Sequence, residues 1–271
     1  VASLQWVLDH RQLYNIVAGN LSFGAGNVAK GSEHEQLDPL YRALAEAGVF
    51  ISVAAGNSYS ADSSNDGLNF LAASNSVAAV GAVWDSDAGP ASWGTGARDF
   101  GTAADRIASF SQRSAGLDLL APGADILNLN RLGGLTVKSG TSMAAPFVAG
   151  TAVLLREAAD ASGALLTASD ILDLMQETAA VIYDGDDEHD NITNSNRSYH
   201  RIDALSALGS LIAKDRASDL HHIPRPAPPA EPAPTMIESE STADRRISEA
   251  IDLLLESGSR AADAEQFALS V

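Results

Sequence analysis

The sequence contains no cysteine and no long apolar run. Without cysteine there can be no disulfide scaffold, no thiol nucleophile and no zinc site built on thiolates. Because no stretch of 18 apolar residues occurs, the sequence also predicts no transmembrane helix.

Basic residues are few as well, with 17 Lys and Arg against 35 Asp and Glu and a formal net charge of -18. A surface of that sign repels phosphate backbones, so we expect no nucleic-acid partner. The 271 residues and the hydrophobic content of 45% are enough for one large domain, or for one medium domain with an appendage.

Composition divides the chain into three segments. Residues 1–213 alternate strand-like and helix-like stretches, residues 214–235 form a proline-rich linker, and residues 236–271 contain one amphipathic helical pattern. We expect this last segment to be an interaction helix or the start of a further domain. Since Val1 already lies inside an amphipathic pattern, we expect the N-terminal part of the first domain to be missing.

The first segment has the pattern of an α/β fold. Short apolar runs predict buried strands, longer amphipathic stretches predict helices, and their alternation predicts helices on both faces of a mainly parallel sheet. The predicted strands are 15–22, 48–55, 77–83, 107–110, 117–120 and 135–138, and the predicted helices are 36–47, 142–159, 168–178 and 203–213.

One sequence motif contains a candidate catalytic residue. Residues 140–150 have the sequence GTSMAAPFVAG, in which a glycine turn delivers Ser142 to the first turn of a helix. The free backbone N–H groups and the helix dipole favour negative charge at that position. Pro146 is expected in or near the first turn, where its missing N–H is tolerated. A plain alternative is a serine N-cap on a buried, alanine-rich helix.

Residues 140–150 resemble the nucleophile motif of the subtilisin-like serine proteases, and other segments resemble further motifs of that family in the family's order. These segments are Asn20-Leu21-Ser22-Phe23-Gly24, Val53-Ala54-Ala55-Gly56-Asn57, Val80-Gly81-Ala82-Val83, Ile107-Ala108-Ser109-Phe110-Ser111 and Leu119-Leu120-Ala121-Pro122-Gly123. The resemblance covers about residues 1–213. It implies a three-layer subtilisin-like fold and a secreted, monomeric endopeptidase that hydrolyses proteins or peptides and needs no cofactor for chemistry.

By this resemblance Ser142 is the nucleophile. Asn57 then donates a hydrogen bond to the oxyanion, alongside the backbone N–H of Ser142. The plain alternative for Asn57 is a turn residue that follows a buried strand.

The resemblance also assigns substrate contacts to six residues. Three of them, Ser22, Phe23 and Gly24, would form one wall of the cleft and pair with an extended peptide. The other three, Ala54, Ala55 and Gly56, would line the pocket for the residue before the scissile bond. The alternative is that all six are ordinary residues at strand ends.

The general base is absent from the sequence pattern. The family's Asp-Ser/Thr-Gly turn and His-Gly helix start do not occur, and no histidine is followed by glycine. We expect the histidines at the surface, the base and its carboxylate upstream of Val1, and the isolated chain to be inactive. The histidines are His10, His34, His189, His200, His221 and His222.

Two further features have structural interpretations. Phe147 stands where family members often carry histidine, and we expect it to fill core space beside the helix. Residues 184–191 are densely acidic but lack the EF-hand pattern. We favour a solvated acidic loop, with a structural calcium ion as the alternative.

Two other functions stay open. A sedolisin-like protease also has a Gly-Thr-Ser nucleophile, but it places an aspartate in the oxyanion hole, which Asn57 argues against. A non-catalytic relative would bind peptides through the cleft and lack the aspartate and histidine altogether.

Overall fold

The computed structural model describes residues 1–32, 34–60, 65–185 and 189–220. Its centre is a six-stranded sheet with the order β1-β2-β3-β6-β10-β9. The first five strands in this order pair in parallel, and β9 is antiparallel to β10. The strands are β1 (Ala18–Leu21), β2 (Phe50–Ala54), β3 (Ala78–Val83), β6 (Leu119–Pro122), β9 (Ala180–Tyr183) and β10 (Ser198–Arg201).

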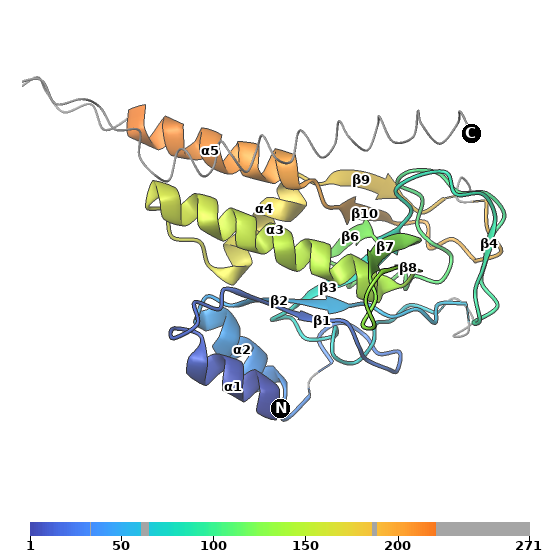
Figure 1. Cartoon of the computed structure of the whole chain (residues 1–271), viewed down its shortest axis with the longest axis horizontal. Coiled ribbons are helices and arrows are strands. Elements are labelled where there is room, and N and C mark those ends of the chain that lie inside the picture. Colours follow the sequence, from blue (N-terminus) through green and yellow to red (C-terminus); the bar gives the residue numbers. More distant parts are fainter. Residues whose placement is uncertain (33, 61–64, 186–188, 221–271) are drawn as a thin grey trace, which may run out of the picture.

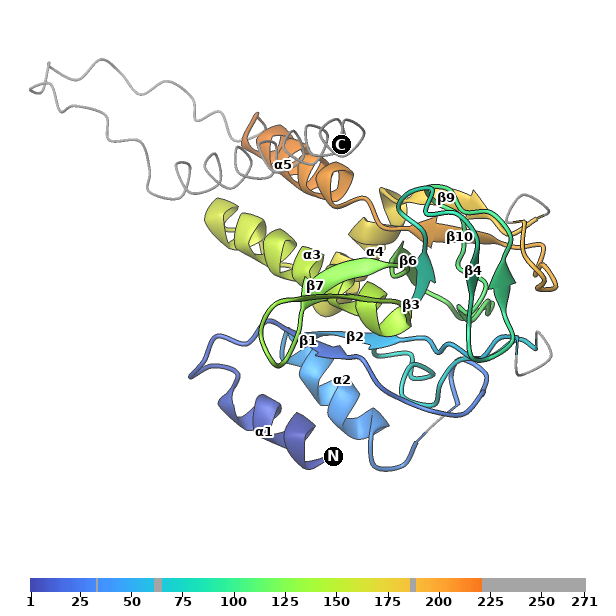
Figure 2. The ribbon, with the colours of Figure 1, turned by 45° about the vertical axis from the view of Figure 1, so that its right-hand side comes forward.

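Helices cover both faces of this sheet (Figures 1 and 2). One face carries α1 (Ala2–His10) and α2 (Asp38–Glu46), and the other carries α3 (Thr141–Ser162), α4 (Ala168–Glu177) and α5 (Ala204–Leu220). The predicted three-layer α/β architecture with a mainly parallel sheet is therefore confirmed.

Strand β2 shows why both faces must be covered. All five of its residues are buried. Phe50 and Ala54 pack into the core under α3, whereas Ile51 and Val53 pack into the core under α1 and α2. Alternate side chains of a strand point to opposite faces, so a continuous apolar run needs a helical layer on each side.

One predicted strand is wrong. Residues 107–110 form only a single bridge, between Ile107 and Val83. The segment turns because its polar groups bond elsewhere: Ser109 binds the Asp99 carboxylate through both its backbone N–H and its hydroxyl.

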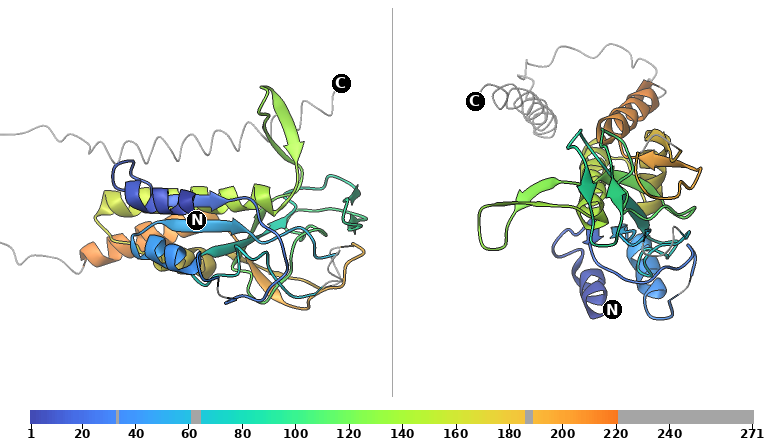
Figure 3. Two further views of the ribbon diagram at one scale, coloured as in Figure 1. Left: turned by 90° about the horizontal axis from the view of Figure 1, so that it is seen from below. Right: turned by 90° about the vertical axis from the view of Figure 1, so that its right-hand side faces the viewer.

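A second difference concerns pairing. The predicted strand at 135–138 is present as β8 (Leu135–Lys138), but it pairs antiparallel with β7 (Ile126–Leu129) in a separate hairpin. In both views of Figure 3 this hairpin projects from the body of the molecule. A further small sheet pairs β4 (Ala91–Ser92) with β5 (Arg98–Asp99). The sequence pattern missed β4, β5, β7, β9 and β10.

The ends of the helices also differ from expectation. Helix α3 continues to Ser162, where Gly163 ends it in a left-handed conformation, and α5 continues to Leu220. The linker prediction from 221 onward and the amphipathic segment 236–271 lie outside the described residues. In the part of the chain that the structure describes, no helix is long and apolar enough to cross a membrane.

Candidate active site at the N-terminus of helix α3

The predicted site residues come from three segments that meet at one edge of the sheet. Ser22 follows β1 and Asn57 follows β2, and these two strands run parallel. The carboxyl ends of parallel strands lie at the same edge, which is where α/β proteins place their sites. Helix α3 begins at this edge with Thr141 and Ser142.

Ser142 and Ser22 exchange two hydrogen bonds. The Ser142 hydroxyl donates to the Ser22 carbonyl oxygen at 3.1 Å, and the Ser22 hydroxyl donates to the Ser142 carbonyl oxygen at 2.7 Å. The nucleophile predicted from sequence is therefore held against the segment predicted to form the cleft wall.

Pro146 explains why Ser142 needs this partner. Pro146 is the sixth residue of α3 rather than part of its first turn. Proline has no N–H, so it cannot make the helical bond to the carbonyl four residues before it, which belongs to Ser142. The hydroxyl of Ser22 supplies the missing donor.

Asn20 and Ser52 make further hydrogen bonds next to the contact between Ser22 and Ser142. The Asn20 side-chain amide donates to the Ser22 hydroxyl at 2.9 Å. The buried hydroxyl of Ser52 donates to the Ala145 carbonyl at 2.9 Å and so connects β2 to the same turn of α3. Sequence reasoning missed Ser52, because a serine within an apolar strand has no local signature.

Asn57 is fixed by Thr141. The Asn57 Oδ1 atom accepts hydrogen bonds from the Thr141 backbone N–H at 2.8 Å and from its hydroxyl at 2.9 Å. The Thr141 hydroxyl also accepts a bond from the backbone N–H of Gly56 at 3.1 Å. The amide is thereby oriented, and among the described residues no protein group accepts a hydrogen bond from its Nδ2 atom. The resemblance did not assign a role to Thr141.

The predicted cleft wall is open to solvent. The Phe23 side chain is 64% exposed, and Gly24 has a φ of 154°. A Cβ atom on Gly24 would lie 2.2 Å from the Asn69 side chain, so a larger residue at position 24 would displace the Asn69 side chain. That side chain accepts a bond from the Leu71 backbone and donates to the Ala54 carbonyl.

The three residues predicted to line the pocket differ in exposure. Ala54 packs into the core under α3, and Ala55 into the core under α1 and α2. Both residues are buried, and their carbonyl oxygens accept hydrogen bonds from Asn69, so neither presents a side chain to solvent. Gly56 has a φ of 119°, and a Cβ atom there would lie 3.0 Å from the Gln112 side chain.

No imidazole reaches the nucleophile. Among the described residues, no histidine or carboxylate contacts Ser142, whose hydroxyl bonds to the Ser22 carbonyl instead. His34, His189 and His200 are exposed, and His10 is half-buried. The prediction of surface positions is confirmed for the three exposed histidines; His221 and His222 lie outside the described residues.

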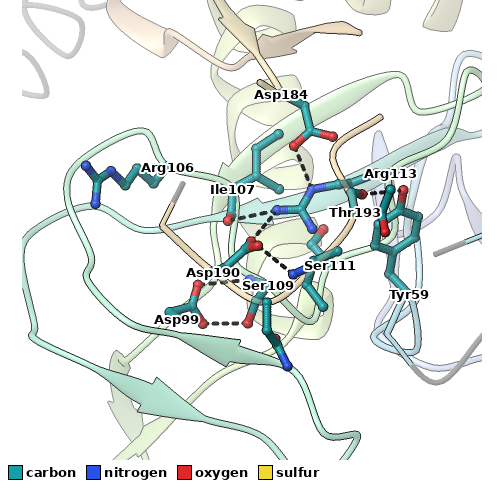
Figure 4. A network of polar contacts seen from close by, with 12 residues as sticks. Tyr59, Asp99, Arg106, Ile107, Ser109, Ser111, Arg113, Asp184, Asp190 and Thr193 are labelled. Carbon is teal, nitrogen blue, oxygen red and sulfur yellow. Dashed lines mark hydrogen bonds and ion pairs between the residues drawn. The ribbon is translucent and has the colours of Figure 1, made fainter. Parts of the chain in front are cut away.

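The acidic segment 184–191 is only in part the solvated loop that we expected. His189 and Asn191 are exposed, the side chains of Asp184 and Asp190 are buried, and residues 186–188 lie outside the described residues. Asp184 and Asp190 turn inward and flank Arg113, which has no exposed surface (Figure 4). The Arg113 guanidinium lies 2.9 Å from each carboxylate and 5.4 Å above the ring of Tyr59. The buried cation explains the correction, because it draws both carboxylates out of solvent. Burial raises the pKa of Asp190, and the charge of Arg113 opposes that rise.

The same carboxylates do not suit a calcium ion. Calcium needs six to eight oxygen ligands, whereas Asp184 and Asp190 already pair with Arg113. Across the residues that the structure describes, no group of three or more His, Asp and Glu side chains could hold a metal.

Phe147 is also placed differently from our expectation. Phe147 is 46% exposed and Val153 is 44% exposed. On the same helix Ala144, Ala145 and Val148 are buried. The prediction that Phe147 fills core space is wrong for this structure, because the residue lies on the face of α3 that turns away from the sheet.

Comparison with known proteins agrees with the fold and the motif. Residues 3–205 match the model of the subtilase family, Peptidase S8. Subtilisin-like protease 1 of Arthroderma gypseum is 34% identical over 169 residues, which are 60% of this chain and 29% of that protein. Subtilisin-like protease 5 of Arthroderma benhamiae is 32% identical over 158 residues, which are 57% of this chain and 33% of that protein.

Solved structures show the same fold. The patellamide maturation protease PatA superimposes with a TM-score of 0.57 at 24% identity, over 76% of this chain and 66% of that one. The prenylagaramide maturation protease PagA also has a TM-score of 0.57, at 23% identity, over 77% of this chain and 66% of that one. The chain spans about a third of the length of the curated relatives named here. With a family match over most of its length and the fold of solved subtilases, this chain belongs to the subtilase family.

Proposed function

We propose that this chain is the nucleophile-bearing part of a serine endopeptidase that hydrolyses peptide bonds in proteins or peptides. The observation that carries the proposal is that Thr141, at the start of α3, orients the Asn57 amide and is followed directly by Ser142, whose hydroxyl bonds the predicted cleft wall. Family membership supports the reaction type.

In this mechanism the Ser142 hydroxyl attacks the carbonyl carbon of the scissile bond. Its proton passes to a histidine, which an aspartate orients, and both are supplied by polypeptide upstream of Val1. The Asn57 amide and the Ser142 backbone N–H donate to the oxyanion that forms. The tetrahedral intermediate collapses, the amine leaves with the proton from the histidine, and water hydrolyses the acyl-enzyme by the same route.

The substrate would lie along Ser22, Phe23 and Gly24. The chemistry uses protein groups alone, so we propose no cofactor; a calcium ion would serve structure, at a site other than the Arg113 carboxylates. We also propose that the protein is monomeric and acts outside the cell, which rests on the family resemblance.

The test compares the complete translation product of the gene with the chain of residues 1–271. We expect the complete product to hydrolyse a casein substrate and to react at Ser142 with a fluorophosphonate. Ser142→Ala should abolish labelling and lower turnover by about 10⁶-fold, the magnitude established for subtilisin itself. The chain alone should do neither, because its serine lacks a base.

Two outcomes would overturn the proposal. If the wild-type complete product neither labels nor hydrolyses casein, a non-catalytic peptide-binding relative takes its place. If the chain of residues 1–271 is active alone, the general base lies within it and the assignment of an upstream histidine fails.

A further inference from the structure

One buried residue, Gln112, holds both chain neighbours of Asn57. Its backbone N–H donates to the Gly56 carbonyl oxygen at 3.1 Å, and its side-chain Nε2 atom donates to the Ser58 hydroxyl at 3.3 Å. We call residues 56–59 the Asn57 loop. Gln112 has no exposed surface, whereas Asn57 is the exposed residue of this loop. The residue that holds the loop is therefore inside the molecule, and the residue that the loop presents is at the surface.

Gly56 is held through both of its backbone polar groups. Its N–H donates to the Thr141 hydroxyl at 3.1 Å, and its carbonyl oxygen accepts the bond from Gln112. Gln112 also packs closely against it, because a Cβ atom on Gly56 would lie 3.0 Å from the Gln112 Cγ atom. The position before Asn57 is thus fixed between the start of α3 and residue 112.

Gln112 is anchored through its own two neighbours. The Ser111 hydroxyl accepts a bond from the Ala82 N–H of β3 at 2.9 Å and donates to the Gln112 carbonyl oxygen at 3.3 Å. On the other side, Arg113 is the buried cation that pairs with two carboxylates (Figure 4). A residue fixed in this way can hold a catalytic group in place, since such groups need a rigid support.

Arg113 also contacts the far end of the Asn57 loop. Its guanidinium lies 5.4 Å above the ring of Tyr59, and the Tyr59 hydroxyl donates to the Thr193 carbonyl oxygen at 3.1 Å. Tyr59 is 2% exposed. The loop is therefore held on both sides of Asn57.

The bonds from Thr141 orient the Asn57 amide only while the backbone of the loop stays in place. Both bonds reach the Oδ1 atom, so a shift of the Asn57 Cα atom would turn Nδ2 about that oxygen. With Oδ1 and the backbone both fixed, the direction of Nδ2 is defined. A donor to an oxyanion must be placed before the charge develops, because reorientation during the reaction costs free energy.

We propose that Gln112 is a positioning residue for Asn57, and that Arg113 with its two carboxylates keeps Gln112 in place. This rests on the proposed function, in which Asn57 donates to the oxyanion. An apolar side chain of the same length would fill the same space without the cost of burying an amide. The bonds of Gln112 to the Asn57 loop explain why a polar residue lies there.

The first experiment removes the Gln112 amide in the complete translation product. Gln112→Met keeps the length of the side chain and loses the bond to Ser58. We expect kcat on a chromogenic peptide substrate to fall about tenfold and KM to stay within about twofold, because displacing a donor costs less than the 10²–10³-fold lost on removing one. The matched control is Gln176→Met on α4, where a half-buried glutamine donates to the Asp118 carbonyl oxygen at 3.1 Å. Its kcat should equal that of the wild type.

The second experiment tests whether Gln112 acts through Asn57. Asn57→Ala removes the donor, so in that background Gln112→Met should lower kcat no further. Ser58→Ala removes the acceptor of the same bond at a half-buried position and should lower kcat by a similar factor to Gln112→Met, and the two changes together should do no more than either alone. An equal loss from Gln112→Met in the wild-type and Asn57→Ala backgrounds would overturn the proposal.

A purely structural role has a different signature. It would lower the melting temperature and leave kcat unchanged at temperatures well below it, and that result, or an equal loss of kcat in the Gln176→Met control, would refute positioning.

Hydrogen exchange of the Asn57 loop gives a readout that does not depend on catalysis. The amides of residues 57–59 should exchange at least about tenfold faster in Gln112→Met than in Gln176→Met, because the loop opens more readily without its bond to residue 112. Equal rates would show that Gln112 does not hold the loop. If the wild-type complete product hydrolyses nothing and does not react with a fluorophosphonate, the proposed function fails, and the catalytic part of this inference fails with it.

Discussion

The cluster of Arg113, Asp184 and Asp190 and the apolar face of the β7–β8 hairpin reverse the usual distribution of polar and apolar groups. In the cluster, a cation and two carboxylates are buried, and each charge has a partner of opposite sign. On that face of the hairpin the four aliphatic side chains are between 55% and 77% exposed; they are Leu127, Leu129, Leu135 and Val137. The difference teaches that this chain buries charges where each has a partner of opposite sign, and leaves aliphatic side chains exposed where the hairpin projects from the body.

The largest effect is expected at the cluster. Arg113→Met leaves Asp184 and Asp190 buried without a cation, which should lower the free energy of unfolding by about 3–5 kcal/mol. The measurement is urea unfolding of residues 1–271. The control is Arg197→Met, which breaks an exposed pair with Asp66 and should cost less than about 1 kcal/mol. Equal losses in the two variants would mean that burial does not distinguish these pairs.

The next effect concerns the Asn57 side chain and should leave stability almost unchanged. Asn57→Asp keeps the oxygen that Thr141 binds but removes the Nδ2 donor and adds a negative charge. Turnover of the complete product should fall by about 10²–10³-fold, the range established for subtilisin when this donor is lost. The check is kcat and KM on a peptide substrate, together with a melting temperature. A raised KM with an unchanged kcat would contradict the oxyanion role.

A smaller effect tests the contact between Ser22 and Ser142. Ser22→Ala removes the donor to the Ser142 carbonyl, which should cost about 1 kcal/mol of folding free energy. In a Pro146→Ala background the helical N–H returns to that carbonyl, so Ser22→Ala should cost less. Unfolding of the four proteins of this double-mutant cycle measures the coupling. Additive losses would show that Pro146 does not create the need for Ser22.

The smallest effect on stability is expected at the N-terminus of α4. Hydrogen bonds from the Thr167 hydroxyl and backbone N–H lower the pKa of Asp170 in a capping box. A lowered pKa means that ionised Asp170 stabilises the fold above its ordinary pKa, and that this contribution is lost as the pH falls through the lowered value.

Asp170→Asn should therefore cost about 0.5–1 kcal/mol near pH 7 and progressively less below about pH 4. Asp173→Asn removes the same charge one turn further along the helix, where it forms no capping box, and serves as the matched control. Urea unfolding at several pH values compares the two variants. A constant difference across the pH range would argue against the capping box as the cause.

Local patterns in the sequence were sufficient for much of the fold. Continuous apolar runs predicted β2 and β3, because a strand buried on both faces has no polar positions. The motif at 140–150 placed Ser142 at the start of a helix, since glycine and the following small residues have strong local preferences. Residues 107–110 failed as a strand because buried polar contacts between Ser109 and Asp99, ten positions earlier, outweighed the local apolar run.

The sequence by itself determined the family, the identity of the candidate nucleophile and the absence of its base motifs. Tertiary structure alone decided that Thr141 orients Asn57 across 84 positions, that Ser22 replaces the donor lost at Pro146, and that Asp184 and Asp190 enclose Arg113. It also decided that the hairpin turns its apolar face outward. The physical reason is that periodicity specifies which side chains share a face, whereas the partner of that face depends on chain segments brought together by folding.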